Sequence, residues 1–289
     1  MSGETTRGGR RHVGRAVRKE IRIDASPEAV WDAWAKPEEI ARWFVDAAEG
    51  EMAAGETVTW IWEAFGYRIP IEVYEAQRGE YLAFGGEPPG RPPALQEVTI
   101  AREGGTTVLR LVNSGFLEGP DWDEELAGTD SGWELALATL AHYLERYRGR
   151  DRTHRLEMRP VEQAPYDAVV PLYTTRAGLE SWVGGAARPG AEPLHRGAPA
   201  ALDLGDGLTL DGEVLAAAPH ELLLSWPETD GVLGLKAFKA GPSRSVALDW
   251  SSWGAGDRVA EVERWMTVAV DRLAAEVESV AAASDRPLA

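Results

Sequence analysis

Hydrophobic and polar residues alternate along the first part of the chain that carries a regular pattern. In residues 17–23 every second side chain is apolar except Lys19, and the side chains between them are charged. A period of two predicts a strand with one buried face. Ser26, followed by Pro27 and an acidic residue, is typical of a helix N-cap and first turn. We therefore expect a strand, a short helix, and a second short helix over residues 38–44.

The period of two returns farther along, with glycines between the runs. The alternating apolar residues are Val58, Trp60, Trp62, Tyr67, Ile69, Ile71, Val73, Leu82 and Phe84. Two further runs, residues 97–102 and 106–112, are joined by Gly104-Gly105. Runs separated by short glycine-containing turns predict an antiparallel meander. We expect loops at residues 87–93, which are rich in Pro and Gly, and at residues 119–129, which are acidic.

A long amphipathic helix closes this half of the chain. It begins at Ser131, and its apolar residues recur at spacings of three and four until Gly149. The members of this stripe are Trp133, Leu137, Leu140, Leu144 and Tyr147. A strand, two short helices, a meander and a long helix together predict an α+β fold.

The same order of elements recurs in the second half, which predicts an internal repeat. The matched positions are Pro27 with Pro165, Trp34 with Leu172, Trp43-Phe44 with Trp182-Val183, Glu72-Val73 with Glu213-Val214, Glu80 with Glu221, Leu82 with Leu223 and Trp133 with Trp265. Where the first copy has Trp60 and Trp62, the second has an aliphatic run. That run consists of Leu202, Leu204, Leu208 and Leu210.

The repeat predicts where the domains begin and end. We expect a disordered basic tail over residues 1–15, a first domain over 16–148, a linker over 149–154, a second and divergent domain over 155–280, and a C-terminal tail over 281–289. A chain of 289 residues is long enough for two ordinary domains.

Composition excludes several classes of function. The net charge of -17 and the isoelectric point near 4.8 make the surface repel phosphate backbones, so we expect no nucleic-acid partner. The chain has no cysteine, which excludes disulfides, thiolate metal sites and cysteine nucleophiles. The five histidines lack metal-ligand spacing, and no glycine pattern suits a phosphate. We expect no metal and no cofactor.

The sequence also predicts where the protein resides. Six basic residues lie among the first nineteen, but no apolar signal-peptide core follows them. No stretch approaches the roughly 20 apolar residues of a membrane span. We expect a cytoplasmic protein that makes no contact with a membrane.

Four motifs carry a resemblance to a known superfamily. They are Ala25-Ser26-Pro27-Glu28-Ala29-Val30-Trp31, Ile40-Ala41-Arg42-Trp43-Phe44, Asn113-Ser114-Gly115-Phe116 and Gly132-Trp133-Glu134. In this order they resemble the SRPBCC (START-like, helix-grip) superfamily, in particular the branch similar to the C-terminal domain of the heat-shock protein 90 ATPase activator. The resemblance covers about residues 16–148, and residues 155–280 resemble the family more weakly.

The resemblance implies two tandem helix-grip domains, each a curved antiparallel sheet around a long C-terminal helix. In many relatives, a cavity between sheet and helix holds an apolar ligand. Because the second copy is richer in Gly, Pro and Ala, and Trp226, Trp250 and Trp253 supply most of its sheet aromatics, we expect its cavity to be smaller or collapsed. No shared reaction is implied, since the superfamily includes lipid carriers, hormone receptors and cyclases.

Inward-facing aromatic residues are the main functional signal. The candidate ligand-binding residues are Trp43, Phe44, Trp60, Trp62, Tyr67, Phe84, Asn113, Phe116 and Trp133. Aromatic side chains can fill a core or line a pocket for a flat apolar ligand, and both interpretations are open. Asn113 shares a strand face with Leu109 and Leu111, so its amide needs a partner. That partner is either the turn at Ser114-Gly115 or a ligand.

We predict a non-enzymatic module that binds a small hydrophobic or aromatic ligand in its first domain. One alternative is a protein-interaction module similar to the chaperone activators. A second alternative is a cyclase-like or hydrolytic enzyme. A closed, dry cavity would favour the interaction module, and an open aromatic cavity would favour ligand binding.

Overall fold

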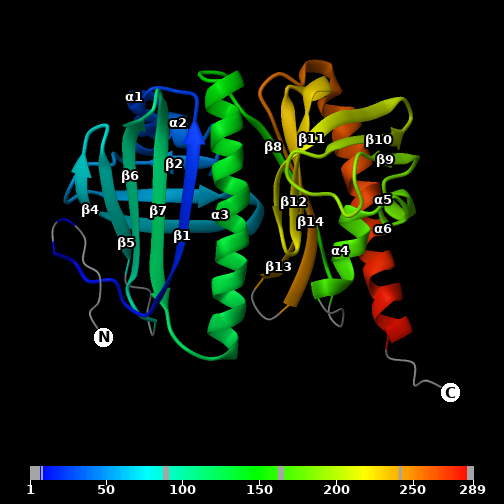
Figure 1. Ribbon diagram of the computed structural model, residues 1–289, viewed down its shortest axis with the longest axis horizontal. Coiled ribbons are helices and arrows are strands. Elements are labelled where there is room, and N and C mark those ends of the chain that lie inside the picture. Colours follow the sequence, from blue (N-terminus) through cyan, green and yellow to red (C-terminus); the bar gives the residue numbers. More distant parts are fainter. Residues whose placement is uncertain (1–6, 8, 87–90, 162–165, 241–242, 285–289) are drawn as a thin grey trace. The chain divides into compact units, whose positions relative to one another are not determined.

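A computed structural model describes residue 7 and residues 9–86, 91–161, 166–240 and 243–284. The chain divides into two compact units, Met1–Asp151 and Arg152–Ala289. Each unit contains a seven-stranded antiparallel sheet and a long helix near its C-terminal end (Figure 1). The predicted α+β fold of two tandem helix-grip domains is confirmed.

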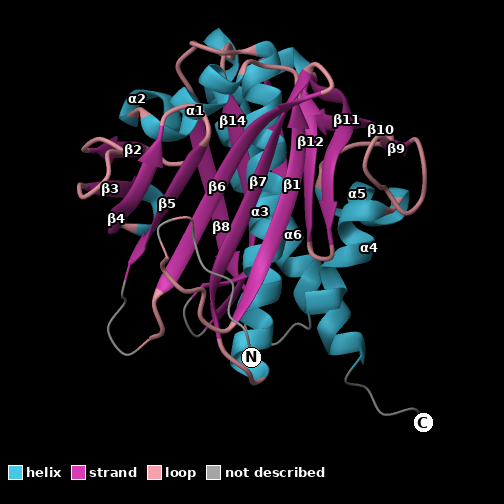
Figure 2. Cartoon of the chain, turned by 60° about the vertical axis from the view of Figure 1, so that its left-hand side comes forward, coloured by secondary structure: helices cyan, strands magenta, loops and turns pink. Residues whose placement is uncertain are grey.

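The first sheet has the strand order β1-β7-β6-β5-β4-β3-β2. Its strands are β1 (Arg15–Ile23), β2 (Ala47–Glu49), β3 (Thr57–Trp62), β4 (Tyr67–Gln77), β5 (Tyr81–Gly86), β6 (Ala94–Glu103) and β7 (Thr106–Phe116). The helices are α1 (Pro27–Ala35), α2 (Pro37–Ile40) and α3 (Pro120–Arg146). The N-terminal strand therefore pairs with the last one, and a meander runs from β2 to β7 (Figure 2).

The short helix α1 forms for the reasons visible in the sequence. The side chain of Ser26 accepts a hydrogen bond from the backbone N–H of Ala29, and Pro27 occupies the first turn. The helix ends at Lys36, before a second proline. Its buried side includes Trp34, which has no exposed surface. The N-cap, the proline and the buried face therefore explain where α1 begins and ends in the sequence.

The long helix α3 begins at Pro120, not at Ser131, so the prediction of an acidic loop over residues 119–129 is wrong. Pro120 occupies the first turn together with Asp121 and Asp123, which favour the positive end of the helix. The side chains of these early turns are largely exposed. They therefore carry no apolar stripe, and the amphipathic pattern begins about three turns after the helix does.

The second sheet repeats the first, in the order β8-β14-β13-β12-β11-β10-β9. Its strands are β8 (Thr153–Pro160), β9 (Ala187–Pro189), β10 (Pro199–Gly205), β11 (Leu208–Ala218), β12 (Glu221–Trp226), β13 (Gly231–Ala240) and β14 (Ser243–Ser252). The helices are α4 (Val169–Thr174), α5 (Arg176–Trp182) and α6 (Val259–Ser284). The first strand again pairs with the last, β8 with β14.

The repeat extends to single hydrogen bonds and to irregularities of the sheets. The register of β4 and β5 shifts between Val73 and Glu75, and that of β11 and β12 shifts between Val214 and Ala216. Each copy also contains an indole N–H that donates to a carbonyl ten residues earlier. These bonds run from Trp43 to Ala33 (2.8 Å) and from Trp182 to Leu172 (3.0 Å).

Three of the predicted matches are displaced by one residue, and they are Trp34 with Leu172, Leu82 with Leu223 and Glu80 with Glu221. Because Leu172 accepts the bond that Ala33 accepts, Tyr173 and not Leu172 is equivalent to Trp34. The turn between β4 and β5 spans residues 78–80, whereas the turn between β11 and β12 spans only residues 219–220. Leu82 is therefore equivalent to Leu222, and Leu223 points to the opposite face.

Residues 9–14 belong to the segment predicted to be a disordered tail, but the structure places them against the first sheet. His12 Nδ1 lies 2.8 Å from Ser114 Oγ, and His12 Nε2 is hydrogen-bonded to the carboxylate of Glu97. The sequence did not predict these contacts, because they are made by single side chains and not by a repeated apolar face that would produce a periodic pattern.

Candidate ligand-binding site

Seven aromatic side chains meet on the inner face of the first sheet, and we call them the aromatic cluster. They are Trp34 from α1, Trp43 and Phe44 from the segment after α2, Trp60 and Trp62 from β3, Phe84 from β5 and Trp133 from α3. Six of the seven belong to the predicted ligand-binding residues. Trp34 was named from the sequence only as a matched position of the internal repeat.

Phe44 is the most connected ring of the aromatic cluster. Its centroid lies 5.3 Å from that of Trp133 in a stacked arrangement and 5.1 Å from that of Trp43. The rings of Trp60 and Trp62 meet it edge-on at 5.4 and 5.7 Å. All of these separations fall in the range of favourable aromatic pairs. The cluster is therefore continuous from α3 across to β3.

The aromatic cluster has a buried end and an end that faces solvent. Trp34 and Phe84 are fully buried, whereas Phe44 and Trp62 are only half-buried. Trp62 pairs with Tyr67 across the β3–β4 turn, and Tyr67 is 53% exposed. The solvent-facing end therefore lies at Phe44, Trp62 and the tip of this hairpin.

Tyr67 and Phe116 lie outside the aromatic cluster. Tyr67 was expected to face inward, but it follows the turn at the tip of the hairpin and stacks on Phe65, with 5.6 Å between the ring centroids. Phe116 is buried at the end of β7, and its ring packs against no other aromatic ring among the described residues. Alternation along a strand correctly places side chains on a face, but it does not say where the covered part of that face ends.

Two indole N–H groups of the aromatic cluster lack a hydrogen-bond acceptor among the described residues. They belong to Trp34 and Trp60, whose side chains are buried. Trp43, by contrast, donates to the carbonyl of Ala33. A buried donor without a partner costs about 1 to 3 kcal/mol, so these two N–H groups are available to an acceptor that the chain does not supply.

Two amide side chains lie on the same inner face, directly opposite each other on neighbouring strands. Gln96 of β6 pairs with Asn113 of β7, and Gln96 also pairs with Phe84 of β5. Within the described part of the chain, Gln96 Oε1 and Asn113 Oδ1 are buried and accept no hydrogen bond. Ser114 and Gly115 lie within β7 rather than in the turn that was predicted, and neither donates to the Asn113 oxygen, which leaves the ligand alternative for that atom.

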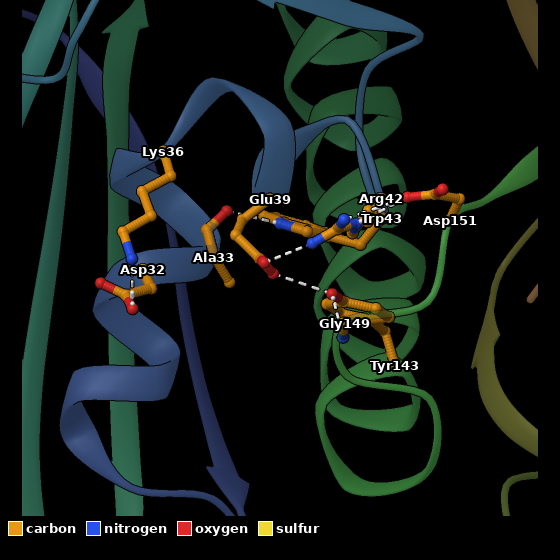
Figure 3. Close-up of polar contacts among 9 residues, drawn as sticks. All are labelled: Asp32, Ala33, Lys36, Glu39, Arg42, Trp43, Tyr143, Gly149 and Asp151. Carbon is orange, nitrogen blue, oxygen red and sulfur yellow. Dashed lines mark hydrogen bonds and ion pairs between the residues drawn. The ribbon is translucent and has the colours of Figure 1, made fainter.

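A polar network holds the helices of the aromatic cluster together (Figure 3). Tyr143 of α3 donates to Glu39 Oε2 of α2 at 2.8 Å and accepts from the backbone N–H of Gly149 at 2.9 Å. Arg42 donates to Glu39 Oε1 at 2.5 Å and to Asp151 Oδ1 at 3.0 Å. The network thus fastens α2 to the end of α3, next to Trp43 and Phe44.

The buried position of Tyr143 has an electrostatic consequence. Burial, together with the hydrogen bond to the Glu39 carboxylate, raises the pKa of Tyr143 to about 12. The phenol therefore stays protonated at neutral pH and remains the donor to Glu39. Its role in this geometry is to position α2 against α3.

Residues 24–145 match the family described as Activator of Hsp90 ATPase homolog 1-like protein. The match covers most of the first domain. We therefore call the first domain the activator-like domain. This match confirms, for the first domain, the resemblance inferred from the four sequence motifs.

Several solved structures are similar to parts of the chain. The Aha1 dimer of Colwellia psychrerythraea is 18% identical, with 47% of this chain and 99% of that chain covered and a TM-score of 0.42. CalU16 of Micromonospora echinospora is 23% identical over 49% of this chain and 82% of its own, with a TM-score of 0.39. DynU16, a protein of the dynemicin biosynthetic locus, is 17% identical over 94% and 99%, with a TM-score of 0.38. A comparison with curated proteins finds no match.

The second domain has different side chains at the positions that carry the unpartnered polar atoms of the activator-like domain. The equivalent pairs are Trp34 and Tyr173, Trp60 and Leu202, Phe84 and Leu224, Gln96 and Leu233, and Asn113 and Trp250. Tyr173 donates to the carbonyl of Lys236 at 2.9 Å, and Trp250 Nε1 donates to Thr229 Oγ1 at 3.2 Å. At these positions the second domain has either no polar atom or one with a partner.

Sequence reasoning missed two residues of the candidate site, Trp34 and Gln96. Trp34 could have been found from its place on the buried side of α1, beside the motif that ends in Trp31. Gln96 had no such signal, because it stands between Leu95 and Glu97, and a polar residue in such a place usually points to solvent. In the described part of the chain, no group of three or more His, Asp or Glu side chains could hold a metal, and no helix there is long and apolar enough to cross a membrane.

Proposed function

We propose that the activator-like domain binds a small aromatic molecule among the rings of the aromatic cluster, between the sheet and α3. The observation that carries the proposal is the pair of buried indole N–H groups, Trp34 Nε1 and Trp60 Nε1, without acceptors among the described residues. A ligand that stacks on these rings and carries an acceptor satisfies both. The function is binding rather than catalysis.

Phe44 is the residue through which the ligand enters. It is half-buried, it lies at the solvent-facing end, and it contacts Trp60, Trp62 and Trp133. Rotation of this one ring would break the ring contacts that link α3 to β3 at the surface. The polar network around Tyr143 holds the neighbouring helix in place while it does so.

Calorimetric titration of the full chain with a panel of fused-ring aromatic molecules tests the proposal. We expect at least one to bind and to quench tryptophan fluorescence. Trp60→Leu, which copies Leu202 of the second domain, should weaken binding roughly tenfold to a hundredfold, because a buried aromatic contact is worth about 1 to 3 kcal/mol. Trp182→Leu in the second domain serves as the matched control and should leave the affinity unchanged.

Stability has to be measured alongside, since loss of a buried tryptophan can cost about 3 to 5 kcal/mol and imitate a binding defect. If the folded Trp60→Leu variant binds with the affinity of the parent, or if no molecule of the panel binds, the proposal that the aromatic cluster binds a ligand is wrong. The alternative is then a protein-interaction module. That alternative is favoured by the exposed apolar side chains of Tyr67 and Ile69, which are 53% and 40% exposed.

A further inference from the structure

The geometry points to the chemical class of the ligand. We propose that it is an uncharged aromatic molecule that carries both a hydroxyl-type donor and an oxygen acceptor, and that Gln96 and Asn113 recognise the donor. This inference rests on the proposed binding function. It adds a polar recognition site on the sheet to the aromatic cluster.

The residues of this site lie next to one another around Phe84 on the inner face of the sheet. Phe84 pairs with Gln96 on the neighbouring strand, and the Phe84 centroid lies 5.5 Å from Trp60 and 6.0 Å from Trp34. Side chains of directly opposite residues in an antiparallel pair lie on one face, with Cβ atoms about 4.5 to 5.5 Å apart. Gln96 therefore lies beside Phe84, Asn113 lies one strand farther along the same face, and the rings of Trp60 and Trp34 contact Phe84.

The chemistry of these four atoms is complementary to one kind of ligand. The oxygens of Gln96 and Asn113 are buried and accept no hydrogen bond within the described residues, so they require a donor. The indole groups of Trp34 and Trp60 donate only, so they require an acceptor. A flat ring that carries an O–H or N–H at one edge and a carbonyl or ether oxygen at another meets both requirements.

The surroundings favour a ligand without charge. The residues of the aromatic cluster and both amides are neutral. Lys19, the charged residue on the inner face of β1, is already held by Asp130 at 2.9 Å and Glu134 at 3.1 Å on α3. An ion placed beside Phe84 would lose its hydration without gaining an opposite charge, which is strongly unfavourable.

The second domain indicates that the fold itself does not need these amides. In the equivalent register, Leu233 replaces Gln96 and Trp250 replaces Asn113. Leu233 and Trp250 are fully buried, and the Trp250 N–H has an acceptor. The same sheet can thus be closed by apolar side chains, and the amide pair in the first domain serves recognition.

Three probes that share one ring system test the donor and the absence of charge: naphthalene, 2-naphthol and 2-naphthoate. Titrated into the full chain, 2-naphthol should bind at least about tenfold more tightly than the other two. Gln96→Leu, which copies the second domain, should remove this preference by weakening 2-naphthol about tenfold while leaving naphthalene unchanged. Thr99→Leu, on the opposite face of β6, is the matched control and should leave all three affinities unchanged.

The outcomes separate this inference from the proposed function. If naphthalene and 2-naphthol bind equally well, or if folded Gln96→Leu keeps the preference, the ligand class is wrong while aromatic binding stands. Tighter binding of 2-naphthoate would overturn the requirement for an uncharged ligand. If none of the three probes binds, both the class and the proposed function fail.

Discussion

Trp43 and Trp60 are buried tryptophans of one domain that differ in a single hydrogen bond. Trp43 Nε1 donates to the carbonyl of Ala33, whereas Trp60 Nε1 has no acceptor among the described residues. Replacing either indole by Phe removes a similar amount of buried surface, but only Trp43→Phe breaks a bond, which costs about 1 to 3 kcal/mol. We expect Trp43→Phe to lower the free energy of unfolding by about 1 to 2 kcal/mol more than Trp60→Phe does. Urea denaturation of the two ligand-free variants and of the parent measures both losses in the free energy of unfolding.

Equal losses in these two variants would contradict the prediction. They would mean that Trp60 Nε1 finds an acceptor in solution, so that a ligand acceptor would not be needed at this position. Circular dichroism of both variants provides the control that each still folds.

The helices α2 and α3 are joined by Tyr143, whose hydroxyl bonds both Glu39 and the backbone N–H of Gly149. Tyr143→Phe leaves the ring in place but removes both bonds, so that Glu39 Oε2 loses its donor and the Gly149 N–H loses its acceptor, while Arg42 still binds Glu39 Oε1. We expect the free energy of unfolding to fall by about 1 to 3 kcal/mol. The backbone amides around α2 should exchange with solvent faster, which hydrogen exchange measures.

Asp151→Asn supplies the comparison for the same network. The Asp151 side chain is 95% exposed, and its ion pair with Arg42 lies at the surface. Exposed ion pairs contribute about 0 to 1 kcal/mol, so this variant should be nearly neutral. A neutral Tyr143→Phe, with unchanged exchange around α2, would show that the network does not hold the two helices together.

The stability of the whole molecule should depend on pH through His142 of α3. Burial, followed by repulsion from Arg146, lowers the pKa of His142 to about 4. The ordinary value of 6.5 applies when the chain is unfolded, so below it the unfolded state binds a proton that the folded state does not. The free energy of unfolding therefore falls as the pH drops from 6.5 towards about 4. We expect this residue to account for about 2 kcal/mol between about pH 7 and about pH 4.5.

Urea denaturation of the parent and of His142→Gln at both pH values measures this contribution. Carboxylates also titrate in this range, but they do so in both proteins, so the difference between the two pH dependences belongs to His142. If the variant loses as much stability on acidification as the parent, His142 is not buried in its neutral form.

At the scale of the molecule, the sequence by itself determined the elements and their repetition. Alternation over residues 17–23 predicted β1, and the stripe from Trp133 to Tyr147 predicted the body of α3. These predictions succeeded because burial of one face imposes a period of two on a strand and of 3.6 on a helix. The second copy followed from the same signals. The early turns of α3 were missed because they bury too little apolar surface to carry a period.

Only the tertiary structure decided which side chains of the candidate site meet and which of their atoms have partners. Trp34, Phe84 and Gln96 come from three elements, and a glutamine in β6 carries no local sign that it faces the aromatic cluster. Tyr67 has the right alternation but lies beyond the covered part of the sheet. One residue fewer in a turn placed Leu223 on the opposite face from Leu82. Hydrogen-bond partners and the boundary with solvent depend on register and packing between residues far apart in sequence, which local periodicity does not specify.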